Sequence, residues 1–229
     1  MYFIGSGGLL HLAVDYCLTN GLKVDGACCP PGDSAVGRLR SRRVEVLETQ
    51  DPNTDLLSLS EDGGDGIVFS INNKHVIQDA LLNAGRSYFN IHAGLIQQYR
   101  GIAEVCIFAA LIHGDSSYGV TLHRLLPDQK VDTGPVVAQL QFALNPEDRF
   151  SDVLRKAMDA CQTIFESNVR AIVESGYHTV VVETARTALS YKDIASLRRG
   201  ADPARLERAS DLGRYSGLLS NLAATIGAP

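Results

Sequence analysis

The start of the chain alternates between apolar runs and glycine turns, and this arrangement limits it to a small set of folds. A short apolar run at residues 2–4 is followed by the turn Gly5-Ser6-Gly7-Gly8, and a helical apolar pattern then continues to Gly21. Residues 22–29 form the next apolar run, which ends at Pro30-Pro31-Gly32. This strand–helix–strand order predicts an α/β fold: a Rossmann-like, mostly parallel sheet flanked by helices.

The rest of the chain continues the alternation and then changes character. We predict strands over 44–47, 67–71, 87–91, 118–122 and 136–140, a turn at Gly63-Gly64-Asp65-Gly66, and helices over 75–82, 102–112 and from Asn145-Pro146-Glu147-Asp148 to Gly176. After about residue 182, short charged amphipathic stretches follow at 191–197 and 203–222. We therefore predict a main domain over 1–182 and a helical C-terminal extension or linker over 183–229. This tail either wraps the main domain or leads to a further domain.

Composition excludes several classes of protein. The 229 residues carry a formal net charge of -5, whereas nucleic-acid binding needs a basic face. No apolar run approaches the length of a membrane span, and Met1 leads directly into the first strand without a signal peptide. The five cysteines form no C-x-x-C pair and no metal-ligand spacing, so we expect buried free thiols, a cytoplasmic protein and no metal.

Three polar residues stand out at the ends of predicted strands. Asn90 and His92 are two apart, so on a strand they share a face, and Asp132 precedes Gly134 after a later strand. Each alone has a plain structural interpretation, as a turn cap or a packed histidine. Together they suit acyl transfer between nitrogens: the amide donates to a developing oxyanion, the imidazole stabilises charge, and the carboxylate passes protons. We also expect Asp132 to raise the pKa of His92.

The order of these motifs resembles a known family. Asn90-Ile91-His92, Tyr99-Arg100-Gly101, residues 119–123 and residues 131–135 are similar to the motif series of folate-dependent formyltransferases. That family includes glycinamide ribonucleotide formyltransferase, the N-terminal domain of methionyl-tRNA formyltransferase, sugar N-formyltransferases and formylation domains of peptide synthetases. The resemblance spans about residues 1–180. It implies that 1–182 is the catalytic domain and that 10-formyltetrahydrofolate is the formyl donor.

The resemblance also implies roles for individual residues. Asn90 corresponds to the oxyanion-binding asparagine, His92 to the catalytic histidine and Asp132 to the aspartate that orients it. The implied folate-binding residues are Asn72, Asn73, Lys74, His75, Val76, Asp128, Gln129, Lys130 and Val131, in two loops expected at the same sheet edge as His92. The implied substrate-side residues are Gly7, Gly8, Ala93, Gly94, Glu104 and His123.

Some of these assignments have alternatives. The turn at residues 5–8 lacks the last glycine of a dinucleotide fingerprint, so it serves either tight packing or phosphate binding. Glu104 either contacts an acceptor ammonium or is an ordinary acid at a helix start. His123 either assists the site or only packs against the Asp132 loop. Residues 93–97 depart from the family pattern, which leaves the acceptor open.

The sequence therefore predicts an N-formyltransferase acting on a small or carrier-bound primary amine. We expect specialised metabolism, such as nonribosomal peptide biosynthesis, with an aminoacyl group on a peptide-synthetase carrier or an amino-sugar nucleotide as acceptor, and with further synthetase domains as partners. Glycinamide ribonucleotide formyltransferase of purine synthesis is one alternative. A non-catalytic, folate-binding docking domain of a megasynthase is another.

Overall fold

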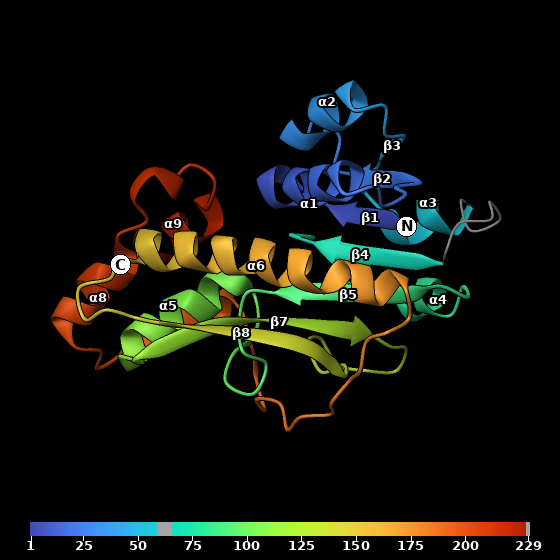
Figure 1. Cartoon of the computed structure of the whole chain (residues 1–229). Helices are drawn as coiled ribbons and strands as arrows, with labels where there is room; N and C mark the ends of the chain where they lie inside the picture. The colour runs from blue at the N-terminus through green and yellow to red at the C-terminus, as the bar shows by residue number, and fades with distance from the viewer. Residues whose placement is uncertain (59–65, 228–229) are drawn as a thin grey trace.

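A seven-stranded sheet forms the centre of the protein. The computed structural model describes residues 1–58 and 66–227, and its strand order is β3-β2-β1-β4-β5-β7-β8 (Figure 1). The strands are β1 (Tyr2–Gly5), β2 (Gly26–Cys29), β3 (Val46–Glu48), β4 (Ile67–Ile71), β5 (Ser87–His92), β7 (Ser117–Leu125) and β8 (Val136–Ala143). The first five are parallel, and β7 and β8 are antiparallel to their neighbours. The expected mostly parallel α/β fold is confirmed.

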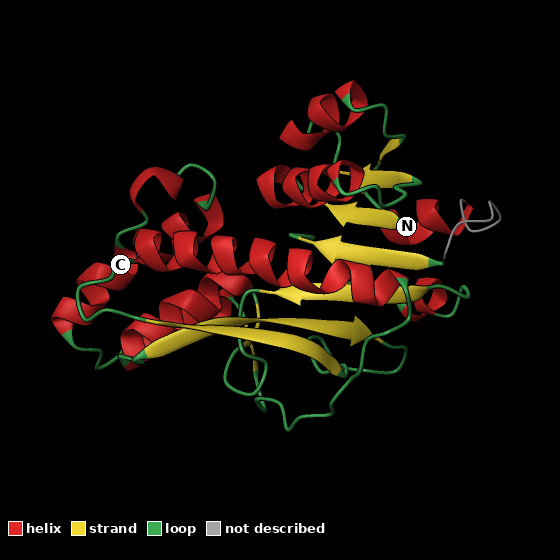
Figure 2. Cartoon of the chain, in the orientation of Figure 1, coloured by secondary structure: helices red, strands yellow, loops and turns green. Residues whose placement is uncertain are grey.

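Helices cover both faces of this sheet (Figure 2). They are α1 (Gly7–Thr19), α2 (Ser34–Ser41), α3 (Pro52–Ser58), α4 (Asp79–Leu82), α5 (Ala103–His113), α6 (Phe150–Val173), α7 (Ile194–Arg198), α8 (Pro203–Ser210) and α9 (Ser220–Gly227). The main apolar core joins one face of the sheet to α1, α5 and α6, and a smaller core joins the other face to α3 and α4. Within the described residues, no helix is both long enough and apolar enough to cross a membrane.

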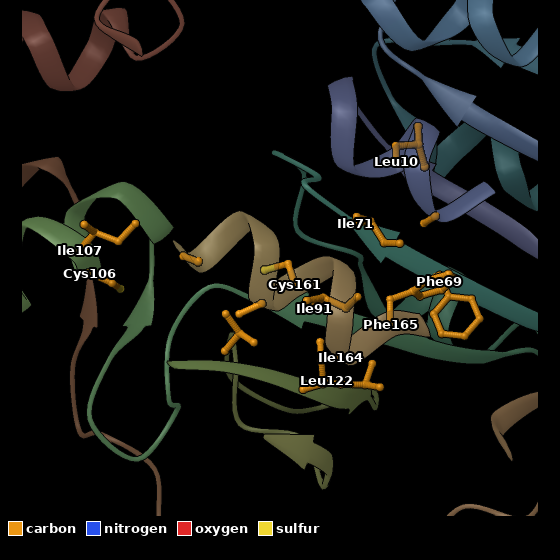
Figure 3. Close-up of a cluster of buried hydrophobic side chains, with 14 of the residues drawn as sticks. Leu10, Phe69, Ile71, Ile91, Cys106, Ile107, Leu122, Cys161, Ile164 and Phe165 are labelled. Carbon is orange, nitrogen blue, oxygen red and sulfur yellow. The ribbon is translucent and has the colours of Figure 1, made fainter. Parts of the chain in front are cut away.

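Aromatic rings from neighbouring strands meet the long helix α6 in the main core. The ring centroid of Phe69 on β4 lies 5.7 Å from that of Phe3, 5.5 Å from Phe89 and 5.1 Å from Phe165 on α6. Figure 3 shows Phe165 beside Phe69, with Ile164 on the same helix near Leu122. Because side chains alternate along a strand, the residues between these rings point to the opposite face. That face carries Asn90 and His92.

Several predicted elements start or end elsewhere. The strand expected over 22–29 covers only Gly26–Cys29, and β7 and β8 are longer than expected. The helix expected over 75–82 begins at Asp79, because the Asn73 side chain bonds both backbone groups of His75 and so replaces the helical bonds. Of the turn predicted at 63–66, only Gly66 lies within the described residues; it has a φ of 73°.

The long helix also starts later than its sequence suggests. Asp148 accepts a hydrogen bond from the backbone N–H of Asn145 (2.8 Å) and one from Lys156 (2.5 Å), so residues 145–148 form a turn. The helix begins at Phe150, where Asp152 accepts from the backbone N–H of Arg149 at 3.0 Å. The acids near residue 148 therefore bend the chain instead of entering the first helical turn.

The tail after residue 182 packs against the main domain. The strand β9 (Ala188–Leu189) pairs with β6 (Arg100–Gly101), and α7 and α8 lie against α5. Ile194, Ala209, Leu212 and Leu222 are buried in the main core. The helix expected over 203–222 is broken near Asp211, whose carbonyl accepts from Ser151 and whose carboxylate pairs with Arg149.

We expect Ile194→Ala to lower the free energy of unfolding by about 2–4 kcal/mol, because the side chain is fully buried and leaves a cavity. Val181→Ala is the control, since Val181 is 83% exposed and its truncation should change stability by less than about 0.5 kcal/mol. Urea unfolding of the two variants measures both values. Equal effects would show that the tail does not contribute to the core.

Candidate active site

Two neighbouring strands place polar side chains on the same face of the sheet. In the register of β5 and β7, Asn90 lies opposite His123 and His92 lies opposite Thr121. Residues two apart on a strand share a face, and directly paired residues on adjacent strands do as well. The four side chains are therefore neighbours. His92, Thr121 and His123 are buried, whereas Asn90 is only half-buried and reachable from solvent.

Asp132 reaches this face by a route that the sequence did not predict. We expected its loop at the same sheet edge as His92, as in an all-parallel sheet. Because β7 runs antiparallel to β5, it ends at Leu125 opposite Tyr88, near the opposite edge. The loop of residues 126–135 then folds back over the sheet face and brings Asp132 to His92.

Close backbone contacts hold this loop in place. Asp132 has a φ of 54°, a left-handed conformation that is uncommon for a residue other than glycine. Its Oδ2 accepts a hydrogen bond from the backbone N–H of Gly101 at 2.9 Å. A Cβ on Gly134 would lie 1.7 Å from the carbonyl oxygen of Arg124, so only glycine allows the loop to pass this close to β7. The conformation of this loop thus fixes the position of the Asp132 carboxylate.

The carboxylate of Asp132 lies between two imidazoles. Its Oδ2 is 3.6 Å from Nδ1 of His92, and its Oδ1 is 3.5 Å from Nε2 of His123. The same Nε2 lies 3.2 Å from Nδ2 of Asn90. The structure thus brings the amide, imidazole and carboxylate together, with His123 as a fourth member between Asn90 and Asp132.

The partners of each ring indicate its tautomer. Nδ1 of His123 is 3.1 Å from the carbonyl oxygen of Arg124, which can only accept, so this nitrogen carries the proton. Nε2 of His123 then accepts from the amide of Asn90 and orients it. In His92 the nitrogen facing an acceptor is Nε2, 3.1 Å from the carbonyl oxygen of Tyr99. In the neutral ring, Nδ1 therefore holds the lone pair that faces Asp132.

Burial decides the charge state of the pair. Burial lowers the pKa of His92, and the nearby Asp132 carboxylate offsets this only in part, so the net direction is downward. Burial also raises the pKa of Asp132, but the positive charge that His92 carries once it is protonated, together with the N–H of Gly101, outweighs burial and brings this pKa to about 2. Asp132 does act to raise the pKa of His92, as we expected, but burial outweighs this effect, so the ring is not kept charged. The resting pair is a carboxylate beside a neutral imidazole, because desolvation of the ring exceeds the attraction of one carboxylate.

Two loops that were expected to bind folate lie beside this cluster. The loop of residues 72–76 follows β4, and Lys74, His75 and Val76 are exposed there. The loop of residues 128–131 precedes Asp132, and its backbone N–H at Asp128 donates to Asp79 at the start of α4 at 3.1 Å. Asn72 is held to Ser6, and Asn73 bonds within its own loop, while Gln129 and Lys130 are exposed.

Comparisons with known proteins agree with this architecture. Residues 60–169 match the formyl transferase family. The chain resembles the formyltransferase family.

Solved structures with this fold include enzymes of two kinds. A sugar N-formyltransferase from Shewanella sp is 16% identical with a TM-score of 0.75, and the match covers 94% of this chain and 89% of that one. The N-formyltransferase from Helicobacter canadensis, in complex with folinic acid and dTDP-3-aminofucose, is 16% identical with a TM-score of 0.67 over 83% of this chain and 72% of that one. Glycinamide ribonucleotide transformylase 1 from Symbiobacterium toebii is 21% identical with a TM-score of 0.67 over 79% of this chain and 92% of that one.

The expected substrate-side residues of this formyltransferase-like chain are mostly engaged by the protein itself. The backbone N–H of Gly7 donates to Asp33 at 2.8 Å, and Glu104 accepts from the hydroxyl of Tyr191 at 2.5 Å. Glu104 is therefore held by the tail, which favours the second of its two interpretations, an acid at a helix start. Gly8 has open space around it, and Ala93 is half-buried.

Gly94 packs closely against the imidazole of His92. It is buried, and a Cβ there would lie 2.5 Å from Nε2 of His92 and 2.8 Å from the carbonyl oxygen of Tyr99. Its carbonyl accepts from the hydroxyl of Thr121 at 2.8 Å. Glycine is needed here because the loop after β5 closes against the imidazole ring.

Sequence reasoning missed two residues that shape the site. The buried guanidinium of Arg100 donates to the carbonyl of Val131 at 2.8 Å, and also to Ala185 and Arg186 in the tail. It therefore ties the Asp132 loop to the C-terminal segment. Tyr99 holds His92 through its carbonyl and bonds His113 and Asp115 through its hydroxyl. Both residues stand in the motif Tyr99-Arg100-Gly101, so the signal was present but not assigned.

One cleft of the described structure lies apart from the Asp132 cluster. Its volume is about 790 Å³, and it lies where the end of α5 meets α7 and α8, lined by residues that include His113, Arg199 and Arg205. Arg205 is already bonded there to the carbonyl of His113 at 2.9 Å. A group of three or more metal-ligating side chains does not occur among the described residues.

The depressed pKa of Asp132 makes stability depend on pH in acid. The folded carboxyl has a pKa of about 2 against an ordinary value of 3.8, so as pH falls the unfolded chain takes up this proton first. The associated stabilisation, about 2 kcal/mol, is present above about pH 4 and is lost as pH falls toward 2. Between about pH 5 and about pH 2, we expect Asp132→Asn to lose less stability than the wild type.

Urea unfolding at several pH values measures this difference. Asp159→Asn is the matched control, because the Asp159 side chain is 73% exposed on α6 and should leave the wild-type pH dependence unchanged. Parallel curves for the wild type and Asp132→Asn would contradict an ionised, buried Asp132.

Proposed function

We propose that this protein is an N-formyltransferase that moves a formyl group from 10-formyltetrahydrofolate to a primary amine. The observation that carries the proposal is the cluster of Asn90, His92, His123 and Asp132 on one face of the sheet, with Asp132 between the two imidazoles. The match of residues 60–169 to the formyl transferase family supports it. So does the fold shared with an enzyme crystallised with 5-N-formyl-THF.

Asn90 is suited to stabilise the oxygen that becomes negative when an amine adds to the formyl carbon. One N–H of its amide is oriented by Nε2 of His123, and the amide has a second N–H to donate. The side chain is half-buried, so a substrate oxygen can reach it while much of the solvent is excluded. A donor that is already oriented needs no reorganisation during the reaction.

His92 and Asp132 are suited to receive the proton that the attacking amine loses. The neutral imidazole has its lone pair on Nδ1, which faces the ionised carboxylate at 3.6 Å. A proton taken up at Nδ1 makes the ring cationic beside Asp132, and it returns to the nitrogen of the departing donor when the old carbon–nitrogen bond breaks. The pair thus acts as a base first and as an acid afterwards.

The two loops beside the cluster fit a flat, partly apolar donor molecule. Val76 is 63% exposed and Val131 is 41% exposed, one on each loop, and the bond of Asp128 to Asp79 fixes the second loop to the start of α4. Exposed apolar side chains next to free backbone groups are typical of a site for a heteroaromatic ring. We assign donor binding to residues 72–76 and 128–131; the donor supplies the formyl group.

For the acceptor we propose the amine of an amino sugar. The Shewanella sugar enzyme matches 94% of this chain and so extends into the tail, whereas the Symbiobacterium ribonucleotide enzyme matches 79%. The tail contacts the site through Arg100, so its presence bears on the reaction. We therefore treat residues 1–182 and the packed tail as one catalytic unit. The five cysteines are free and buried, which supports a reducing compartment such as the cytoplasm.

Replacing Asn90 tests the proposed chemistry. We expect Asn90→Ala to lower kcat for formyl transfer by about 10²–10³-fold, the usual effect of losing one oxyanion donor, with little change in the KM for the formyl donor. Formyl gain on a panel of amino sugars, followed by mass spectrometry, measures it. Gln98→Ala removes an exposed amide near the site and is the control. A chain that formylates no amine, or an unaffected Asn90→Ala, would contradict the proposal.

Replacing Asp132 tests the proton transfer. Asp132→Asn keeps the size of the side chain but removes the charge that balances a protonated His92, so we expect kcat to fall by about 10²-fold or more. Donor binding, measured by calorimetry with 5-formyltetrahydrofolate, should stay within about threefold, because the carboxylate acts on the proton and not on the donor. Loss of donor binding with unchanged kcat on saturation would assign Asp132 to the donor site instead.

A further inference from the structure

The turn between β1 and α1 lies within reach of an acceptor molecule. Gly5 is in register with Ile71 on β4, and Ile71 is in register with Ile91 on β5, between Asn90 and His92. Adjacent strands are about 4.8 Å apart, so the turn lies about 10 Å from the catalytic strand. That span is comparable to a small amine substrate. Whatever part of the acceptor points away from the reacting nitrogen toward β1 meets this turn.

A glycine turn that leads into a helix normally favours anions. The backbone N–H groups of the first helical turn have no partners within the helix, and the helix dipole adds partial positive charge there. Phosphate is the usual ligand of such turns. In this protein, however, the N–H of Gly7, the first residue of α1, donates to Oδ1 of Asp33 at 2.8 Å. The Asp33 carboxylate therefore accepts the hydrogen bond that a bound anion would otherwise accept at this turn.

Asp33 is held rigidly in this position. It is the N-cap of α2, and its Oδ1 also accepts from the backbone N–H of Ala35 at 2.8 Å. The residue before α1, Ser6, makes no cap bond to its own helix, because its hydroxyl donates to the carbonyl of Asn72 at 2.8 Å. The N–H of Gly7 therefore depends on a side chain from the neighbouring loop.

A second carboxylate lies near Asp33, in an ion pair with an arginine. Glu48 at the end of β3 accepts from the N–H of Gly32 at 3.0 Å and pairs with Arg40 at 2.8 Å. Burial, and after it the charges of Asp33 and Glu48, raise the pKa of Cys29 to about 12, while Arg40 acts in the opposite direction. A small pocket at this strand end is lined by residues that include Cys29, Pro30 and His75.

We propose that Asp33 is a specificity determinant, which excludes phosphate from the α1 end of the site and selects acceptors that present a neutral or cationic group there. This inference rests on the proposed function for the location of the acceptor. It disfavours a compact phosphorylated acceptor such as a ribonucleotide. If an acceptor carries phosphates, they lie elsewhere than at this turn, since a second anion there would face the Asp33 carboxylate at close range.

Two variants of the full-length chain separate charge from contact. Asp33→Asn removes the charge but keeps an oxygen that can accept from Gly7 and Ala35. Asp33→Ser still caps α2 and leaves the N–H of Gly7 free. Asp159→Asn, on α6 and far in sequence from this turn, is the control for the loss of one negative charge. Circular dichroism confirms folding, and if Asp33→Ser fails to fold, Asp33→Asn decides the test.

The first readout is binding of inorganic phosphate and pyrophosphate at constant ionic strength, measured by calorimetry. We expect no measurable binding to the wild type or to Asp159→Asn. Affinity should rise about tenfold or more in Asp33→Ser, with Asp33→Asn between them. Phosphate binding to the wild type equal to that of Asp33→Ser would overturn the proposal. So would variants that bind phosphate no better than the control.

The second readout is formyl transfer to any amine that the wild type accepts. We expect phosphate to compete with the acceptor in Asp33→Ser but not in the wild type, because only the variant can hold phosphate next to the acceptor. Competition of equal strength in both would overturn the proposal. If no amine is formylated, the proposed function fails, and the phosphate titration still decides the role of Asp33.

Discussion

A single buried carboxylate organises the candidate active site. Asp132 bonds the backbone N–H of Gly101 and lies between the rings of His92 and His123. A charge that is removed from water must be compensated locally, and here the compensation comes from three different segments of the chain. Those segments are thereby fixed relative to one another. The left-handed backbone at Asp132 and the close passage at Gly134 are accommodated for the same reason.

Arg100 connects the C-terminal tail to the loop that carries Asp132. Arg100, next to Gly101, donates to the carbonyl of Val131 on one side and to the carbonyls of Ala185 and Arg186 on the other. A buried guanidinium with three carbonyl partners links the catalytic loop and the tail in one rigid contact. The tail also covers the main core with Ile194. Its role is therefore structural support of the site as well as burial of apolar surface.

The charge pattern distinguishes the two ends of the site. At β5, a neutral imidazole next to a carboxylate can take up a proton, and the amide of Asn90 can donate to an oxyanion. At the start of α1, Asp33 turns a position that usually favours anions into one that repels them. The first end sets the type of reaction, and the second limits what the acceptor can carry.

The sequence by itself determined the fold class, most of the strands and the residues to consider for the candidate site. Alternation of apolar residues predicts β4 and β5, and the spacing of two between Asn90 and His92 puts them on one face, because side chains of a strand alternate between its faces. Motif order identified Asp132. These are local properties of the chain, or are carried by a short motif, so they can be read without coordinates.

Only the tertiary structure decided how these residues are used. The reversed direction of β7 depends on pairing between distant segments, and it changes the route by which Asp132 reaches His92. The neutral state of His92 follows from burial on all sides, which no single segment specifies. The sequence offered Gly7 and Glu104 as substrate-side residues. In the structure, Gly7 bonds Asp33 and Glu104 bonds Tyr191. Both partners come from distant elements that only folding brings near.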